Sequence, residues 1–276
     1  MEIPTWLGAT IAFLVGASVG SFASSVAWRL PREVSIIGPR SFCESCERTL
    51  PLWVNIPILA YIGLRGRCLM CGAPIPFRHF LAELALAITA LYLYLTFPLG
   101  GAIARFVLCT ALWVVAIIDY DWRIIPHSIT FPGMILGLLA GLLIMPEVGW
   151  RNSLAGLVLG AGVLFLAGEL YQLVRGREGV GMGDVWMLGM VGAFLGWIGV
   201  AFTLFFGSVF GVIGGLLTAL TGGSVGPEPL ADPVSDQAEA DVSILRTEVP
   251  FGPYLALAAG IYALFQPQLT RWYLGG

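Results

Sequence analysis

Two groups of side chains in the sequence have types and spacing suited to chemistry: a pair of aspartates beside apolar runs, and four cysteines in a polar segment. Asp119 stands in AIIDYDWRIIP and Asp184 stands in GVGMGDVWML. Acids in or at the edge of membrane spans are costly and usually face a bundle interior or an aqueous cavity. Two carboxyl groups held close together do not both ionise easily, so one stays protonated while the other acts as a base on water. Hydrolysis of a peptide bond needs such a pair.

Glycines precede Asp184 at positions 179, 181 and 183. Glycine adopts positive φ and lets another backbone come close, so Gly181 and Gly183 predict room for a substrate strand beside the acid. A glycine turn that opens a helix also leaves free N–H groups, which favour a nearby carboxylate. The alternative is that each aspartate only caps a helix at the membrane interface.

Three further acids flank the apolar runs. Asp121 lies two residues from Asp119 and therefore on a different side of a continuous helix. We expect Asp121 to be solvated or paired with Arg123. Glu83 and Glu169 are candidates for polar packing or for contact with a substrate, and their spacing does not decide between these roles.

The four cysteines, Cys43, Cys46, Cys68 and Cys71, form two CxxC pairs with 21 intervening residues. Each pair can direct two thiolates at one metal, and two pairs complete a tetrahedral zinc site of the structural kind. The alternatives are two disulfides or four inert thiols, but a reducing cytoplasm disfavours disulfides. A module of about 50 residues with few large apolar side chains has too small a core to stand alone, so bound metal would supply its folding energy. With four protein ligands the site is closed, and we expect no zinc chemistry there.

The composition indicates that membrane helices position these groups. Hydrophobic residues make up 58% of the 276 residues and charged residues 11%, with a mean hydropathy of +0.87. Soluble domains carry about 25% charged residues, and a soluble core cannot absorb this much apolar sequence. The runs of near-spanning length are 6–27, 80–97, 101–118, 128–145, 153–174, 185–198, 200–220 and 251–266. The sequence therefore predicts an all-α polytopic membrane protein with about eight transmembrane helices and a small cytoplasmic tetracysteine module between the first two.

Arginine positions predict the orientation, because cytoplasmic flanks collect basic residues. All 14 basic residues are arginine. Eight spans with the N-terminus outside leave only Arg105, Arg151 and Arg271 on the outer side. The same topology brings Asp119 and Asp184 to the cytoplasmic face at one depth. The N-terminal stretch lacks the positive n-region of a signal peptide, so we interpret it as a retained first helix.

The chain divides into five segments. These are a first transmembrane helix (1–28), a cytoplasmic Cys-rich module (29–79), a transmembrane core with both aspartates (80–220), an acidic cytoplasmic loop (221–249), and a last transmembrane helix with the C-terminus (250–276). The loop is rich in Gly, Pro, Asp and Glu and has little apolar side chain to bury, which predicts disorder. Cys109 falls inside an apolar run and is expected to pack rather than to bind metal.

The ordered set of motifs resembles the type IV prepilin peptidases. The motifs are GSF followed by WRLP in the first helix, NIP and LRGRC within the tetracysteine segment, IDYDWRIIP, GMGD, and PFGPYLALAAG in the last helix. The resemblance covers nearly the full chain except 221–249. It implies a bifunctional aspartyl protease of the bacterial inner membrane, whose peptidase core is the 80–220 segment.

The resemblance also implies substrates and roles. Such an enzyme cuts the short basic leader of prepilins or pseudopilins after a Gly on the cytoplasmic side. It then N-methylates the new N-terminus with S-adenosylmethionine. Asp119 and Asp184 correspond to the catalytic pair, and the four cysteines to the metal-associated region that is linked to methyl transfer. This chain departs from the family at Ser24, His127 and Trp186, where the family usually has Asn, Asp or Asn, and Lys.

Other functions stay open at this point. A proton-coupled transporter would use the same acids as a relay and would show transport without leader cleavage. A membrane scaffold that docks a partner through the cysteine module would tolerate Asn at both aspartates. A GxGD peptidase for other substrates, such as preflagellins, is a nearer alternative, although the archaeal kind generally lacks the tetracysteine loop. We expect prepilin-type substrates and the lipid bilayer as partners, and no nucleic acid.

Overall fold

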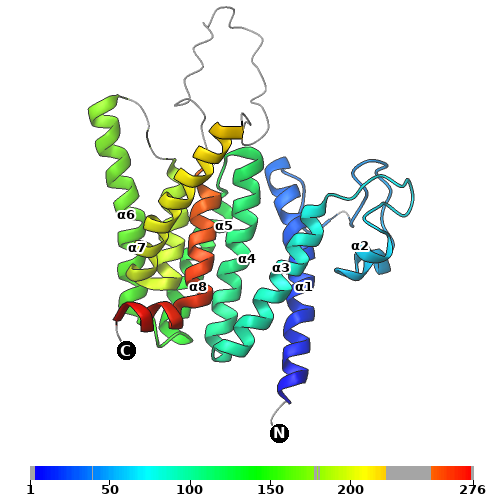
Figure 1. Ribbon diagram of the computed structural model, residues 1–276, viewed down its shortest axis with the longest axis horizontal. Helices are drawn as coiled ribbons and strands as arrows, with labels where there is room; N and C mark the ends of the chain where they lie inside the picture. The colour runs from blue at the N-terminus through cyan, green and yellow to red at the C-terminus, as the bar shows by residue number, and fades with distance from the viewer. Residues whose placement is uncertain (1–3, 39, 177–178, 180, 222–249, 275–276) are drawn as a thin grey trace, which may run out of the picture.

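A computed structural model of the chain describes residues 4–38, 40–176, 179, 181–221 and 250–274. The helices are α1 (Thr5–Arg29), η1 (Leu30–Arg32), η2 (Leu52–Asn55), α2 (Leu59–Gly63), α3 (Phe77–Thr96), α4 (Leu99–Trp122), α5 (His127–Leu143), α6 (Gly149–Arg175), α7 (Met182–Thr221) and α8 (Gly252–Leu274). Within these residues the only β pairing is two isolated bridges, so the all-α prediction is confirmed. Figure 1 shows the long helices side by side in a bundle, with the small Cys-rich module attached to one side of α1 and α3. The predicted loop 221–249 lies outside the described residues except for its first residue, which ends α7.

The long helix α7 contains a break where two apolar runs were predicted to meet. Gly196 has φ 73° and ψ −178°, which is not helical and which glycine adopts most easily. Beyond it, Gly207 lies against Leu255 and Gly211 lies against Phe251, so the second half of α7 runs antiparallel to α8. With α7 counted as two halves, each predicted apolar run has become one long helical segment.

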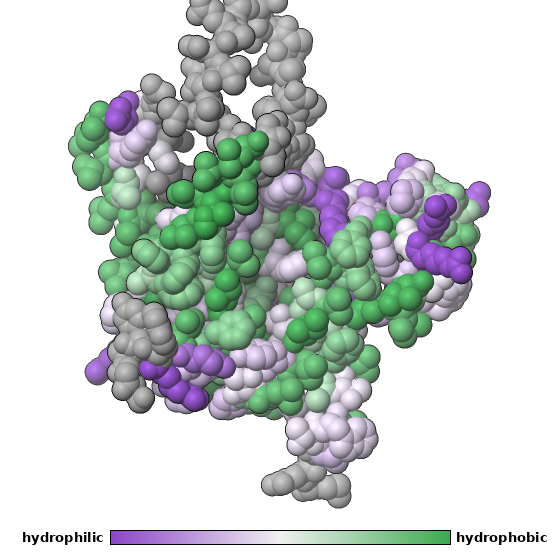
Figure 2. Space-filling view, in the orientation of Figure 1, coloured by the Kyte–Doolittle hydropathy of each residue, from purple (hydrophilic) through white to green (hydrophobic). Residues whose placement is uncertain are grey.

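The bundle has the surface of a membrane protein. By length and composition, α3, α4, α6, α7 and α1 together with η1 can each cross a membrane, and α5 is a shorter apolar helix. Figure 2 shows hydrophobic side chains over the side of the bundle, whereas hydrophilic ones gather toward its ends and on the module. This pattern fits a lipid-facing wall with polar ends.

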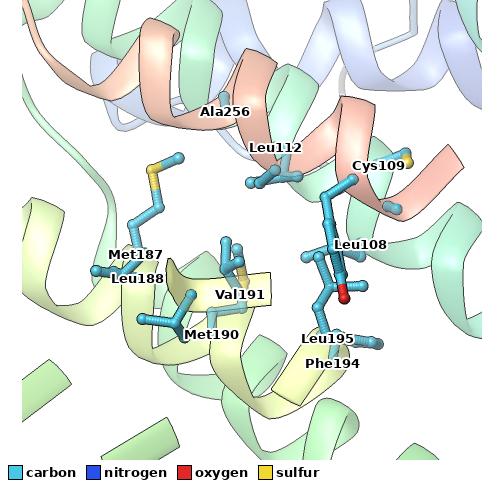
Figure 3. Close-up of a cluster of buried hydrophobic side chains, with 14 of the residues drawn as sticks. Leu108, Cys109, Leu112, Met187, Leu188, Met190, Val191, Phe194, Leu195 and Ala256 are labelled. Carbon is cyan, nitrogen blue, oxygen red and sulfur yellow. The ribbon is translucent and has the colours of Figure 1, made fainter. Parts of the chain in front are cut away.

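The helices that carry the candidate residues are fixed by close packing. On α6 and α7, a Cβ at Gly192 would lie 2.0 Å from the Gly156 carbonyl oxygen, so the two backbones touch there. Small residues permit such contacts between membrane helices. Figure 3 shows Leu108 and Leu112 of α4, Val191 of α7 and other buried side chains gathered beneath Ala256 of α8. The same core therefore orients α4, α7 and α8 relative to one another.

Arg105, which the sequence assigned only to the outer flank, is buried inside the bundle with 1% of its surface exposed. Its guanidinium donates to Glu147 Oε1 at 2.9 Å and to Gln266 Oε1 at 2.5 Å, and it lies 4.1 Å from the Phe97 ring centroid. A buried charge requires such partners. Arg105 thus ties α4 to α8 at the end of the bundle opposite to the aspartates.

Candidate active site and metal centre

Asp119 lies in the last turn of α4 and is 7% exposed. The Gly252 N–H at the start of α8 donates a hydrogen bond to its carboxylate. A Cβ at Gly252 would lie 2.5 Å from Asp119 Oδ2, which is closer than atoms can approach. The first residue of α8 is therefore fitted against this carboxyl group.

Asp184 lies in the first turn of α7, and its N–H donates to the Gly181 carbonyl oxygen at 3.1 Å. Its Oδ1 atom is buried and has no hydrogen-bond partner in the described part of the chain. Its carboxyl group is close enough to that of Asp119 for the two to interact electrostatically. A buried polar atom without a partner is costly, so this oxygen is suited to receive a proton, a water or a substrate group. The structure thus brings the two sequence-predicted aspartates together at one end of the bundle.

The two glycines predicted to leave room for a substrate have different surroundings. A Cβ at Gly183 would lie 2.7 Å from Ile125 Cβ, so the connection between α4 and α5 occupies that space. A Cβ at Gly181 would lie 3.5 Å from Asp184 Oδ2, which is ordinary van der Waals contact. The small size of Gly183 lets α7 begin against Ile125, whereas a side chain at Gly181 would lie beside the Asp184 carboxyl group.

Two other acids have partners distant in sequence. Asp121 pairs with Arg78 at the start of α3, with 2.7 Å between Oδ2 and Nη1, so it is ion-paired, and its described partner is distant in sequence. The two side chains are 29% and 40% exposed, and such a pair contributes at most about 1 kcal/mol. Glu83 on α3 accepts a hydrogen bond from the Ile58 N–H at 2.7 Å. Its described contacts are with Ile58 of the Cys-rich module and with Ser21 of α1, and not with the aspartate pair.

Two of the three positions that depart from the family pattern, His127 and Trp186, belong to an aromatic group near the start of α7. His127 stacks on Phe131 with 5.2 Å between ring centroids, and Phe131 meets the Trp186 ring edge-on at 5.3 Å. Trp186 therefore packs against α5, which gives an apolar contact where a Lys would place a charge.

The cysteines lie in two matching turns. In the first, the Cys43 N–H donates to the Arg48 carbonyl oxygen and the Glu47 N–H donates to the Cys43 carbonyl oxygen. In the second, Cys68, Ala73 and Gly72 make the same two bonds. A bridge between Phe42 and Thr49, or between Arg67 and Pro74, closes each turn. The repeated geometry points the two sulfurs of each pair in one direction.

The four sulfurs fit one metal ion. The Sγ atoms of Cys43, Cys46, Cys68 and Cys71 all lie within 4.8 Å of one another, and those of Cys43 and Cys71 are 3.8 Å apart. Zn–S bonds of about 2.3 Å in a tetrahedron separate the sulfurs by about 3.8 Å. The backbone N–H groups of Cys71 and Met70 lower the pKa of Cys68 to about 7, whereas, against the lowering effect of Ala73, desolvation and the hydrogen bonds of the other three cysteines raise the pKa of Cys71 to about 11, so Cys68 is the thiol of this pair that ionises first. Cys109 lies in the buried core of the bundle, as expected.

Sequence reasoning missed Gly252 and the buried role of Arg105. Gly252 stands within PFGPYLALAAG, a motif of the last helix in which nothing local indicates a role for the glycine. Only its contact with Asp119, more than a hundred residues earlier in the chain, shows why a side chain cannot be accommodated there. The one available signal was a glycine at the first position of a helix directly before a proline.

Two family models match separate parts of the chain. Residues 14–97, which contain the four cysteines, match the Bacterial Peptidase A24 N-terminal domain, and residues 106–216, which contain both aspartates, match the Type IV leader peptidase family. The chain is 32% identical to a prepilin leader peptidase/N-methyltransferase of Myxococcus xanthus, over 98% of this chain and 95% of the relative. It is 35% identical to one of Burkholderia pseudomallei (99% and 90%) and 30% identical to one of Aeromonas hydrophila (98% and 94%). No solved structure matches the chain.

Proposed function

The chain belongs to the type IV leader peptidase family, and on this premise we propose that it removes the basic leader of type IV prepilins or pseudopilins after a Gly. Cleavage takes place at the cytoplasmic face of the bacterial inner membrane, and the N-terminus of the enzyme lies outside. The observation that carries the proposal is the meeting of Asp119 and Asp184 at one end of an apolar bundle.

In this proposal the two carboxyl groups share one proton. Asp119, whose negative charge the Gly252 N–H stabilises, takes a proton from water as the water attacks the scissile carbonyl carbon. Asp184, in its protonated form, donates to the carbonyl oxygen. When the tetrahedral intermediate collapses, the proton gained by Asp119 passes to the amine that leaves, and a hydroxyl of the intermediate returns its proton to Asp184, which restores the starting state of the pair. Gly181, beside Asp184 Oδ2, is the proposed contact for the substrate backbone, and Gly183 supports that position through Ile125.

We also propose that the enzyme N-methylates the amine produced by cleavage, with S-adenosylmethionine as the donor. The names of the relatives join the two activities in one protein, and their match covers nearly the whole of this chain. The tetracysteine cluster, with four sulfur ligands and no open position, is proposed to hold a structural zinc ion.

Co-expression with a candidate prepilin, followed by mass measurement of the N-terminus of the product, tests both activities. We expect a product without its leader that carries the added mass of one methyl group. An intact leader in cells that contain correctly inserted enzyme would count against the peptidase proposal and favour the transporter or scaffold alternatives. A trimmed product without the methyl group would count against methylation alone.

Substitution of Gly252 by Ala is expected to reduce leader cleavage by about 100-fold, because a displacement of about 1 Å at a catalytic group has this effect. The new Cβ displaces the Asp119 carboxylate, which lies 2.5 Å from that position. The measurement is the rate of leader removal in detergent with purified prepilin.

The matched control is Gly260→Ala on the same helix, where a Cβ meets nothing within 4 Å. We expect this variant to cleave at the wild-type rate. Equal rates for both alanine variants would contradict the role of Gly252 in positioning Asp119.

A further inference from the structure

The Cys-rich module contains an apolar segment that neither the cysteines nor the aspartates explain. Residues 50–64, LPLWVNIPILAYIGL, include no charged side chain and lie between Arg48 and Arg65. A helix that crosses a bilayer needs about 20 residues, so a run of this length is typical of a buried core or of a segment at the membrane interface. The structure separates these two possibilities, because it shows which side chains are buried.

The large side chains of this segment do not form a core. Five large apolar side chains in and next to it are each between 48% and 68% exposed: Trp53, Ile56, Leu59, Ile62 and Phe77. We refer to these five as the apolar face of the module. A contiguous exposed apolar patch of this kind marks a surface that something apolar covers.

We propose that the apolar face of the module lies among the lipid acyl chains of the leaflet on the module's side of the membrane. In this arrangement η2 and α2 anchor the module at the membrane interface. Neither leader cleavage nor methylation is needed for such an anchor. Its depth beside α3, its continuity with the lipid-facing side of α3, and the bonding and charge of the segment support it in turn.

The segment lies beside α3 and not beyond its end. Glu83 Oε2 accepts the Ile58 N–H at 2.7 Å. Glu83 is six residues after the start of α3, which corresponds to about 9 Å along a helix. At this level α3 also touches α1, because a Cβ at Gly20 would lie 2.6 Å from the Ala82 carbonyl oxygen. Figure 1 shows α2 alongside these two helices rather than above their ends. Both helices can cross a membrane, so the segment lies at a depth where lipid surrounds the bundle.

The apolar face continues a stripe of exposed side chains on α3. Phe77, Leu81, Ile88 and Leu95 are all exposed. Their spacing of four, seven and seven residues puts them on one side of the helix, as on a helix that presents this side to lipid. Tyr61 of α2 packs on Phe77 with 6.3 Å between ring centroids, which joins the module to the stripe. Figure 2 shows hydrophobic residues along the lower edge of the module and hydrophilic ones above them.

The bonding and the charge of the segment suit contact with acyl chains. Lipid offers no hydrogen-bond partner to a backbone, so a segment in lipid must bond within the protein. The N–H groups of Ala60, Ile62 and Leu64 donate to the carbonyl oxygens four residues earlier at 2.9–3.1 Å. Charges occur only at the borders of the segment, where Arg48 and Arg65 are exposed. Long arginine side chains in such places reach the phospholipid headgroups.

Lipid fits this face better than a protein partner does. At the depth of Glu83 the outer side of α3 faces the bilayer, so a water-soluble protein does not reach the apolar face. A second copy of this chain, packed through its own membrane helices, is the occupant that could replace lipid there. An experiment that identifies the contacting molecule separates the two.

Photo-crosslinking of the full-length protein tests the anchor. A benzophenone amino acid replaces Leu59 or Ile62, one position at a time, and the purified protein is reconstituted in vesicles of phosphatidylethanolamine and phosphatidylglycerol. Benzophenone bonds to C–H groups that it touches, so mass spectrometry of the labelled peptide identifies what covers each position. We expect adducts with the mass of one phospholipid at both positions. The same label at Ile88, in the middle of α3, is the reference for lipid contact.

The matched control carries the label at Arg48, which is also exposed but belongs to the turn closed by the bridge between Phe42 and Thr49. Phe42 packs on Trp28, next to the last residue of α1, so this turn lies nearer the end of α1 than α2 does. An interfacial helix buries its apolar face by only about 5–10 Å, and we therefore expect at least about tenfold less lipid adduct at Arg48 than at Leu59.

Gel filtration at the elution volume of the unlabelled protein establishes that each variant is folded. Adducts of positions 59 and 62 with protein would overturn the anchor, as would an equal yield of lipid adduct at Arg48 and Leu59. The absence of lipid adducts at both positions, when Ile88 gives them, would overturn it as well. The crosslinks do not depend on activity, so an enzyme that fails to cleave or to methylate still tests the anchor, and failure of the anchor leaves the proposed function intact.

Discussion

Replacement of Asp119 or Asp184 by Asn is expected to reduce leader cleavage by about 1,000-fold or more, the effect of removing one member of a catalytic unit. The amide keeps the shape of the carboxyl group, so the packing of α4 against Gly252 and of α7 against Ile125 should survive. What is lost is the proton exchange, because an amide neither accepts a proton from water nor donates one as an acid does. The measurement is the single-turnover rate of leader removal.

The double variant sharpens this test. Residues that act as one unit give non-additive losses, so the double Asn variant should be about as inactive as the worse of the two single variants. Glu169→Gln on α6 is the control, since Glu169 is exposed and the change from acid to amide is the same. Normal trimming by both single variants, each correctly inserted, would disprove the dyad.

The helices and the meeting of the two aspartates were predictable because both follow from strong local signals. Apolar runs of near-spanning length have one stable structure in a bilayer, where every backbone group must bond within its own helix. Alternating spans then determine which ends meet, so Asp119 at the end of one helix and Asp184 at the start of another come to the same end of the bundle. The cysteine spacing is equally direct, because each CxxC turn contains its own geometry.

The contacts that complete the sites were not predictable, because they join residues far apart in the chain. Nothing near Asp121 in sequence indicates that Arg78 is its partner, and nothing near Gly252 indicates Asp119. The burial of Arg105 is of the same kind, since flank counting assigns an arginine to one side of the membrane without showing what it touches. Hydropathy determines depth and side, whereas packing determines partners.

Removal of the metal is expected to unfold the Cys-rich module, because structural zinc contributes about 10–16 kcal/mol of apparent binding energy in small domains. Among the described side chains of residues 30–76, Cys68 alone is buried, so the module has almost no apolar core of its own. We expect one zinc ion per chain in the wild type and none in Cys43→Ser, by elemental analysis of purified protein. Cys109→Ser is the control and should keep its zinc, because Cys109 lies in the bundle core.

The loss of the module should separate the two activities. The core that orients α4, α7 and α8 contains no residue of the module, so the aspartate pair keeps its geometry when the metal is removed. A cavity of about 240 Å³ between the Cys-rich module and the helices α1 and α3, in contrast, has Cys43 and Cys68 in its wall, and this wall is lost when those turns unfold. We therefore expect Cys43→Ser to lose methylation and donor binding while it retains much of the leader cleavage. Complete loss of cleavage in a correctly inserted Cys43→Ser protein would show that the module supports the aspartates through contacts other than this core.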